Sequence, residues 1–99
     1  QKILAYGASA RSSTLLNYCG IDSRNIIAIV DKNPLKHNLL SPGTEIPIIS
    51  YQEGLDILKT EDNLFLLAWN FEKEIIRDLK HDGYEGEFIV PLPNDPRKI

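Results

Sequence analysis

Residues 6–20 read Tyr-Gly-Ala-Ser-Ala-Arg-Ser-Ser-Thr-Leu-Leu-Asn-Tyr-Cys-Gly, and they join a short apolar segment to an amphipathic one through a glycine. The apolar residues 3–6 stop at Gly7, as expected of a buried strand that ends in a tight turn. The residues that follow have helical spacing, and Gly20 stops them. A helix that starts directly after such a turn presents free N–H groups with partial positive charge. This stretch therefore predicts a strand, a glycine turn and a helix, with an anion-binding surface at the turn.

Five apolar segments separated by helical patterns decide the fold class. The predicted strands are residues 3–6, 26–30, 46–49, 64–69 and 88–90. Three helices are predicted: the first ends at Gly20, the second begins at Ser50, and the third runs from Asn70 to Gly83. Strands that are apolar throughout are typical of a parallel sheet covered on both faces. The simplest right-handed winding gives the strand order 3-2-1-4-5. We therefore expect an α/β, three-layer Rossmann-like domain that spans residues 1–99 as a single unit.

Local signals place the helix ends. Ser12, Ser13 or Thr14 can cap the first helix, and Cys19 shares a helical face with Leu15 and Leu16, which predicts that it is part of the core. Ser50 followed by Glu53 has the spacing of a capping box at the start of the second helix.

Composition excludes several function classes. A net charge of −3 and a pI near 5.3 give no basic field for a nucleic-acid backbone. One cysteine forms no internal disulfide, which fits a reducing cytoplasm, and no apolar run approaches the roughly 18 residues of a spanning helix. We expect a soluble, cytoplasmic protein with no nucleic-acid or membrane partner. Because the sequence contains no methionine and begins at Gln1, we also expect it to be part of a longer chain.

The turn after the first strand matches the dinucleotide fingerprint G-x-G-x-x-G only in part. Gly7 occupies the first glycine position, whereas Ser9 and Ser12 stand at the second and third. The second glycine normally lets the backbone approach a pyrophosphate, so this turn is poorly suited to NAD in its usual pose. Asp31, at the end of the second strand, has two open interpretations: it accepts hydrogen bonds from a ribose, or it forms an Asx turn with the residues before Pro34.

In a sheet of this order, ligands bind at the carboxyl ends of the strands where the winding reverses. The candidate substrate-binding residues are accordingly Gly7, Ala8, Ser9, Arg11, Ser12, Ser13, Asp31, Asn33, Trp69 and Asn70. Arg11 suits a phosphate or is an ordinary surface residue, and Trp69 stacks on a base or sugar, closes the edge of the core or contacts another domain. His37 and His81 have no partner at metal-ligand spacing, so we predict no metal site. No nucleophile with its base can be assembled, so we name no catalytic residue.

Taken in order, these residues resemble the C-terminal domain of the sugar C-methyltransferase family over nearly the whole chain. The resemblance is carried by Tyr6-Gly7-Ala8, residues 14–21 (Thr-Leu-Leu-Asn-Tyr-Cys-Gly-Ile), Asp31-Lys32-Asn33-Pro34 with Lys36, residues 42–44 and 46–48, Trp69-Asn70-Phe71 with 74–76, and residues 88–93. It implies a longer enzyme that uses S-adenosylmethionine to methylate a carbon of a nucleotide-linked deoxysugar. It further implies that S-adenosylmethionine and zinc are bound by other domains, and that this domain holds the nucleotide-sugar against the methyltransferase domain. Where the family usually has Lys-Gly-Asn, this chain has Arg11-Ser12-Ser13.

Two other functions stay open at this point. One is an NAD-type nucleotide-binding module, favoured by the fold and Asp31 but opposed by the missing glycines. The other is a structural domain that only packs against a catalytic neighbour.

Overall fold

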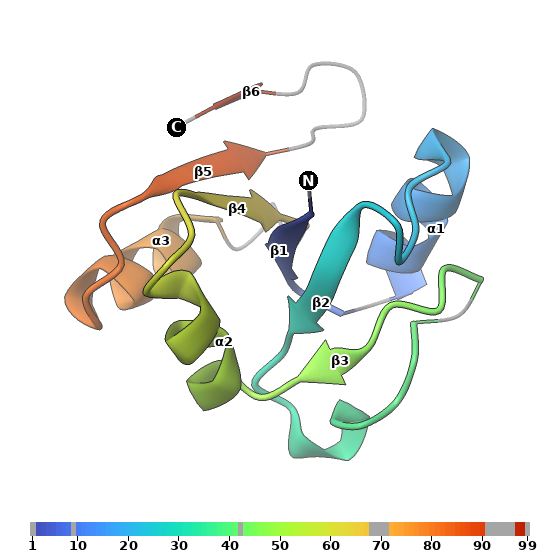
Figure 1. Cartoon of the computed structure of the whole chain (residues 1–99), viewed down its shortest axis with the longest axis horizontal. Coiled ribbons are helices and arrows are strands. Elements are labelled where there is room, and N and C mark those ends of the chain that lie inside the picture. Colours follow the sequence, from blue (N-terminus) through green and yellow to red (C-terminus); the bar gives the residue numbers. More distant parts are fainter. Residues whose placement is uncertain (1, 9, 42, 68–71, 91–96, 99) are drawn as a thin grey trace.

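The computed structural model describes residues 2–8, 10–41, 43–67, 72–90 and 97–98. Along the chain the elements are β1 (Ile3–Tyr6), α1 (Ala10–Cys19), β2 (Ile26–Val30), the 3₁₀ turn η1 (Pro34–Lys36), β3 (Ile48–Ile49), α2 (Tyr51–Leu58), β4 (Asn63–Leu66), α3 (Glu72–His81), β5 (Glu87–Val90) and β6 (Arg97–Lys98) (Figure 1).

The strands form one sheet in the order β3-β2-β1-β4-β5-β6. The first five are parallel, which confirms the predicted order 3-2-1-4-5 and the Rossmann-like fold. The two-residue strand β6 pairs antiparallel with β5 and was not expected from the sequence. Because β1 pairs with β2 on one side and β4 on the other, the winding reverses at the end of β1.

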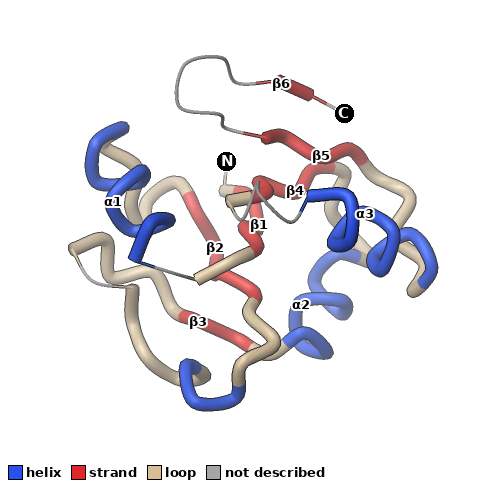
Figure 2. The backbone as a smooth tube through the Cα atoms, turned by 180° about the vertical axis from the view of Figure 1, so that it is seen from behind, coloured by secondary structure: helices blue, strands red, loops and turns tan. Residues whose placement is uncertain are grey.

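Helices cover the two faces of the sheet unequally. Helices α2 and α3 contribute Leu58, Ile75 and Leu79 to one buried cluster, whereas α1 contributes Leu16 to a second cluster. Consecutive β1 residues alternate between them, with Leu4 in the first cluster and Ala5 in the second. The clusters therefore lie on opposite faces, and the domain has three layers, with α1 apart from α2 and α3 (Figure 2).

The start of α1 differs from the sequence expectation. The helix begins at Ala10, so Ser12, Ser13 and Thr14 lie inside its first turns and do not cap it. Ser12 is buried, as is Leu16 four residues later. Hydroxyl side chains favour both caps and early helical positions, and the sequence has a run of them. The preceding residue, Ser9, lies outside the described residues.

The end of α1 corrects a second expectation, because Cys19 is exposed and is not part of the core. Gly20 takes a positive φ of 70°, its N–H bonds to the Asn17 carbonyl, and the N–H of Ile21 bonds to the Leu16 carbonyl at 2.9 Å. These bonds form a Schellman motif, which ends the helix and changes the direction of the chain. Ile21 packs against the core in place of the cysteine.

Helix α2 starts as predicted. The Ser50 hydroxyl accepts from the Glu53 N–H at 3.1 Å, and the Glu53 carboxylate accepts from the Ser50 N–H at 3.3 Å, which confirms the capping box. None of the helices in the described ranges has the length and apolar character needed to cross a membrane.

Candidate functional site

The turn that follows β1 lies at the carboxyl edge of the sheet, beside the end of β2. Gly7 has a φ of 104°, a backbone conformation that residues other than glycine rarely adopt. Its N–H bonds to the Val30 carbonyl at 2.8 Å. On the other side of β1, the Leu67 N–H bonds to the Tyr6 carbonyl at 2.9 Å. The end of β1 is thus fixed from both neighbouring strands.

Asp31, the residue after β2, uses both of its carboxylate oxygens within the protein. Oδ2 accepts from the Ala8 N–H at 3.0 Å, and Oδ1 accepts from the Asn33 N–H at 2.8 Å. The second bond is the Asx turn proposed from the sequence. Asn33 in turn caps η1, because its Oδ1 accepts from the Leu35 N–H at 3.0 Å.

The short turn η1 brings Lys36 back to Ala8 and Asp31, at the turn after β1. Its ammonium donates to the Ala8 carbonyl and lies 3.8 Å from Asp31 Oδ2. The next residue, His37, donates from Nε2 to the main-chain carbonyl of Asp31 at 2.7 Å. Segment 31–37 is therefore tied to the turn after β1 by side chains at several points.

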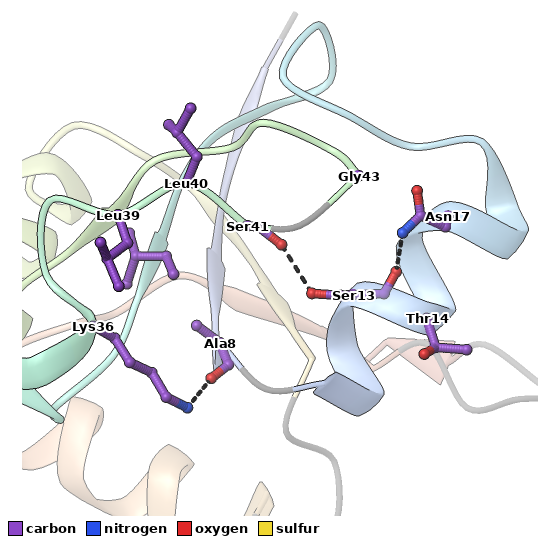
Figure 3. Close-up of a pocket in the computed structure, with 10 residues that line it drawn as sticks. Ala8, Ser13, Thr14, Asn17, Lys36, Leu39, Leu40, Ser41 and Gly43 are labelled. Atoms are coloured by element: carbon purple, nitrogen blue, oxygen red, sulfur yellow. Dashed lines mark hydrogen bonds between the residues drawn. The ribbon is translucent and has the colours of Figure 1, made fainter.

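Between α1 and the segment that follows η1 lies a pocket of about 600 Å³ (Figure 3). It is lined by Ala8, Ser13, Thr14, Asn17, Lys36, Leu39, Leu40, Ser41, Gly43 and Ile48. Its wall is mostly apolar, and Lys36 is the one charged side chain among these described lining residues. The wall thus combines apolar surface with a single positive charge among its described lining residues.

A hydrogen bond between two serines joins the two sides of the pocket, and a second bond lies within α1. The Ser13 and Ser41 hydroxyls lie 3.0 Å apart, and Asn17 Nδ2 donates to the Ser13 carbonyl at 2.9 Å (Figure 3). Gly43 has a positive φ of 77°, and a Cβ there would lie 2.8 Å from the Asn17 amide atoms. The positive φ favours glycine at this position, and a side chain there would also displace the Asn17 amide.

The sequence-predicted site residues fall into three groups. Ala8 and Ser13 line the pocket, with Gly7 and Asp31 beside it. Ser12 is buried within α1, and Asn33 is a cap. Ser9, Trp69, Asn70 and the side chain of Arg11 lie outside the described part of the structure.

Sequence reasoning missed most of the pocket wall. Leu39, Leu40, Ser41 and Gly43 come from a loop that was predicted only as a connection. One signal could have found them: Leu39 and Leu40 are adjacent apolar residues in a polar loop, and both are more than half exposed.

The pKa of Tyr6 and the arrangement of possible metal ligands also bear on the chemistry at the carboxyl edge of the sheet. Burial, followed by the nearby charge of Asp31, raises the pKa of Tyr6 to about 12, so its phenol is neutral at physiological pH. Within the ranges that the structure describes, no three His, Cys, Asp or Glu side chains are grouped so that they could hold a metal ion.

The strand order 3-2-1-4-5 and the glycine turn after β1 define a Rossmann-like domain. Within that class, the chain belongs to the C-methyltransferase C-terminal domain family, whose sequence profile matches residues 1–93. C-methyltransferase NovU of Streptomyces niveus is 37% identical over 100 residues, an alignment that covers 98% of this chain and 23% of the relative. The chain thus spans about a quarter of the length of this curated relative.

A solved structure with the same architecture is UDP-D-quinovosamine 4-dehydrogenase from Vibrio fischeri. The two superpose with a TM-score of 0.66 at 18% identity, over 100% of this chain and 93% of that chain. At this level of identity the likeness shows the fold alone.

Proposed function

We propose that this chain is the substrate-binding C-terminal domain of an S-adenosylmethionine-dependent C-methyltransferase that acts on a nucleotide-linked sugar. Family membership supports the methyltransferase context. The observation that carries the substrate-binding role is the pocket between α1 and residues 36–43. Its volume of about 600 Å³ falls within the roughly 300–1,000 Å³ of small-molecule sites.

The lining of the pocket suits the parts of a nucleotide-sugar. Leu39, Leu40 and Ile48 offer apolar surface for a base or a deoxysugar ring. Lys36 supplies a positive charge for a diphosphate. The hydroxyls of Ser13 and Ser41 bond to each other and can exchange that bond for a ligand hydroxyl.

The chemistry belongs, in this proposal, to the rest of the enzyme. S-adenosylmethionine supplies the electrophilic methyl group. In a Rossmann-like fold its ribose would be held by an acidic residue at the end of β2. Here both oxygens of Asp31 bond main-chain N–H groups and its side chain is only 16% exposed, which leaves little of the carboxylate for a ribose. We therefore assign S-adenosylmethionine and zinc to other domains, and this domain to binding and orienting the substrate.

The test uses a side chain that fills the pocket without disturbing the core. Thr14 lies on the exposed side of α1 and lines the pocket, so Thr14→Trp places a large ring in it. Tyr18, one turn further along α1, is 89% exposed and does not line the pocket, so Tyr18→Trp is the matched control.

In the full-length enzyme we expect Thr14→Trp to raise the KM for the nucleotide-sugar about tenfold or more, a loss of about 1.4 kcal/mol in binding. The KM for S-adenosylmethionine and both constants of Tyr18→Trp should stay unchanged. An unchanged nucleotide-sugar KM in Thr14→Trp would refute the substrate-binding role. Micromolar binding of NAD to the wild type by calorimetry would instead favour a dinucleotide module.

A further inference from the structure

The main-chain N–H and carbonyl of Ala8 are each held by a side chain from one segment. The N–H donates to Asp31 Oδ2 at 3.0 Å, and the carbonyl accepts from the Lys36 ammonium. The two side chains also attract each other, with 3.8 Å between Lys36 Nζ and Asp31 Oδ2. We call Asp31, Lys36 and the main chain of Ala8 the Ala8 clamp.

The clamp joins the first turn of the fold to the pocket. Ala8 and Lys36 both line the pocket, whereas Asp31 does not. Asp31 is only 16% exposed at its side chain, and its main chain is held in turn by His37 at 2.7 Å. The carboxylate is therefore placed to fix its neighbours and not to contact a ligand in the pocket.

The clamp also occupies the position that defines dinucleotide binding in related folds. There an acidic residue about 20 positions after the glycine turn accepts hydrogen bonds from a ribose. Asp31 stands in that position, but its oxygens already accept from Ala8 and Asn33.

We propose that Asp31 is a positioning residue for an anionic ligand of the pocket: it holds Ala8 and Lys36 in the geometry that binds the ligand's phosphate. This inference deepens the proposed function and rests on it.

The direction in which Asp31→Asn changes anion binding distinguishes a positioning role of Asp31 from a direct electrostatic effect of its charge. Asp31 lies 3.8 Å from Lys36, the one charged side chain among the described lining residues, so removing its negative charge should by itself strengthen the binding of an anion. If Asp31 instead positions Ala8 and Lys36, Asp31→Asn weakens anion binding, because an amide cannot accept both main-chain N–H bonds. The two explanations predict opposite directions for the same substitution.

The experiment titrates thymidine diphosphate into the full-length enzyme and its variants by calorimetry. Asp31→Asn should weaken binding about fivefold or more, and Lys36→Met about tenfold or more, with partial recovery in Lys36→Arg, which keeps the charge. The matched controls are Asp56→Asn and Lys59→Met, an exposed ion pair of 3.3 Å on α2, and they should bind as the wild type does. Melting temperatures of all variants check that each is folded.

Steady-state kinetics distinguish a positioning role of Asp31 from a general loss of stability. We expect Asp31→Asn to raise the KM for the nucleotide-sugar with little change in kcat or in the KM for S-adenosylmethionine. Equal or tighter binding of thymidine diphosphate by Asp31→Asn would overturn the positioning role, even with the proposed function intact. If Asp31→Asn does not fold, unchanged binding by Lys36→Met overturns it equally. Wild-type enzyme that does not bind thymidine diphosphate would overturn the proposed function and this inference together.

Discussion

Gly54 in α2 offers a test of how this helix packs against the end of β2. Gly54 is buried, and a Cβ placed there would lie 2.4 Å from Val30 Cγ2 and 3.1 Å from Cγ1. Carbon atoms pack best at about 3.5–4.0 Å, and the branched side chain of Val30 cannot rotate freely away. Val30 is 1% exposed, its carbonyl anchors Gly7, and Asp31 follows it directly.

Gly54→Ala therefore has two opposing effects on stability. Replacing glycine by alanine inside a helix gains about 1 kcal/mol, whereas overpacking a core costs about 1–3 kcal/mol. Because the contact is with a stiff, buried side chain, we expect the overpacking to dominate. The free energy of unfolding should fall by about 1–2 kcal/mol, or roughly 4–15 °C in melting temperature for a domain of this size.

A double-mutant cycle in urea, followed by circular dichroism, isolates the contact. Val30→Ala alone should cost about 2–3 kcal/mol through lost burial and the cavity. In that background the clash is gone, so Gly54→Ala should be neutral or stabilising by up to about 1 kcal/mol. If Gly54→Ala stabilises the protein with Val30 present, and the two substitutions are additive, the packing described for α2 against β2 is wrong.

Three further outcomes are expected. Ser50→Ala should lower the free energy of unfolding by about 1 kcal/mol in the same urea assay, because it removes one half of the capping box, and no loss would contradict that box. Cys19, exposed at the end of α1, should react with a thiol reagent in the folded protein as fast as in urea, and strong protection would place it in the core after all. Burial raises the pKa of Tyr6 and of Tyr84 from 10.0 to about 12, so the folded state holds these protons more tightly than the unfolded state. The stability that these two tyrosines contribute should therefore be constant below pH 10 and fall between pH 10 and 12, so that the loss over this range is less steep in Tyr84→Phe, and an equal slope in that variant would be the contrary result.

The sheet could be predicted from sequence because its strands are unbroken apolar runs bounded by Gly7, Asp31 and Pro47. Their order then follows from right-handed winding, which depends little on detail. The helix ends were harder to predict. The run Ser12 to Thr14 offers several caps of similar quality, and only the tertiary burial of Ser12 shows that the helix has already begun.

The pocket could be predicted only on one side. Ala8 and Ser13 belong to a local strand–turn–helix pattern, and local patterns are visible in a sequence. Leu40 and Gly43 reach the pocket through a loop whose path is set by contacts with α1, and no periodicity encodes such a path. The Asx turn of Asp31, in contrast, is a local feature: the Asn33 N–H lies 2.8 Å from Asp31 Oδ1, as the sequence allowed.

A second, smaller hollow of about 160 Å³ lies against α2, lined among others by Gln52, Lys59 and Asp82. It provides an internal comparison for the central claim, that the pocket beside Ala8 is the ligand site. The most direct measurement is a titration of the ¹⁵N-labelled 99-residue chain with thymidine diphosphate, followed by amide chemical shifts. We expect saturable shifts at Ala8 and Lys36 with Lys59 unmoved. Shifts confined to the α2 hollow, or none at millimolar ligand, would contradict the claim.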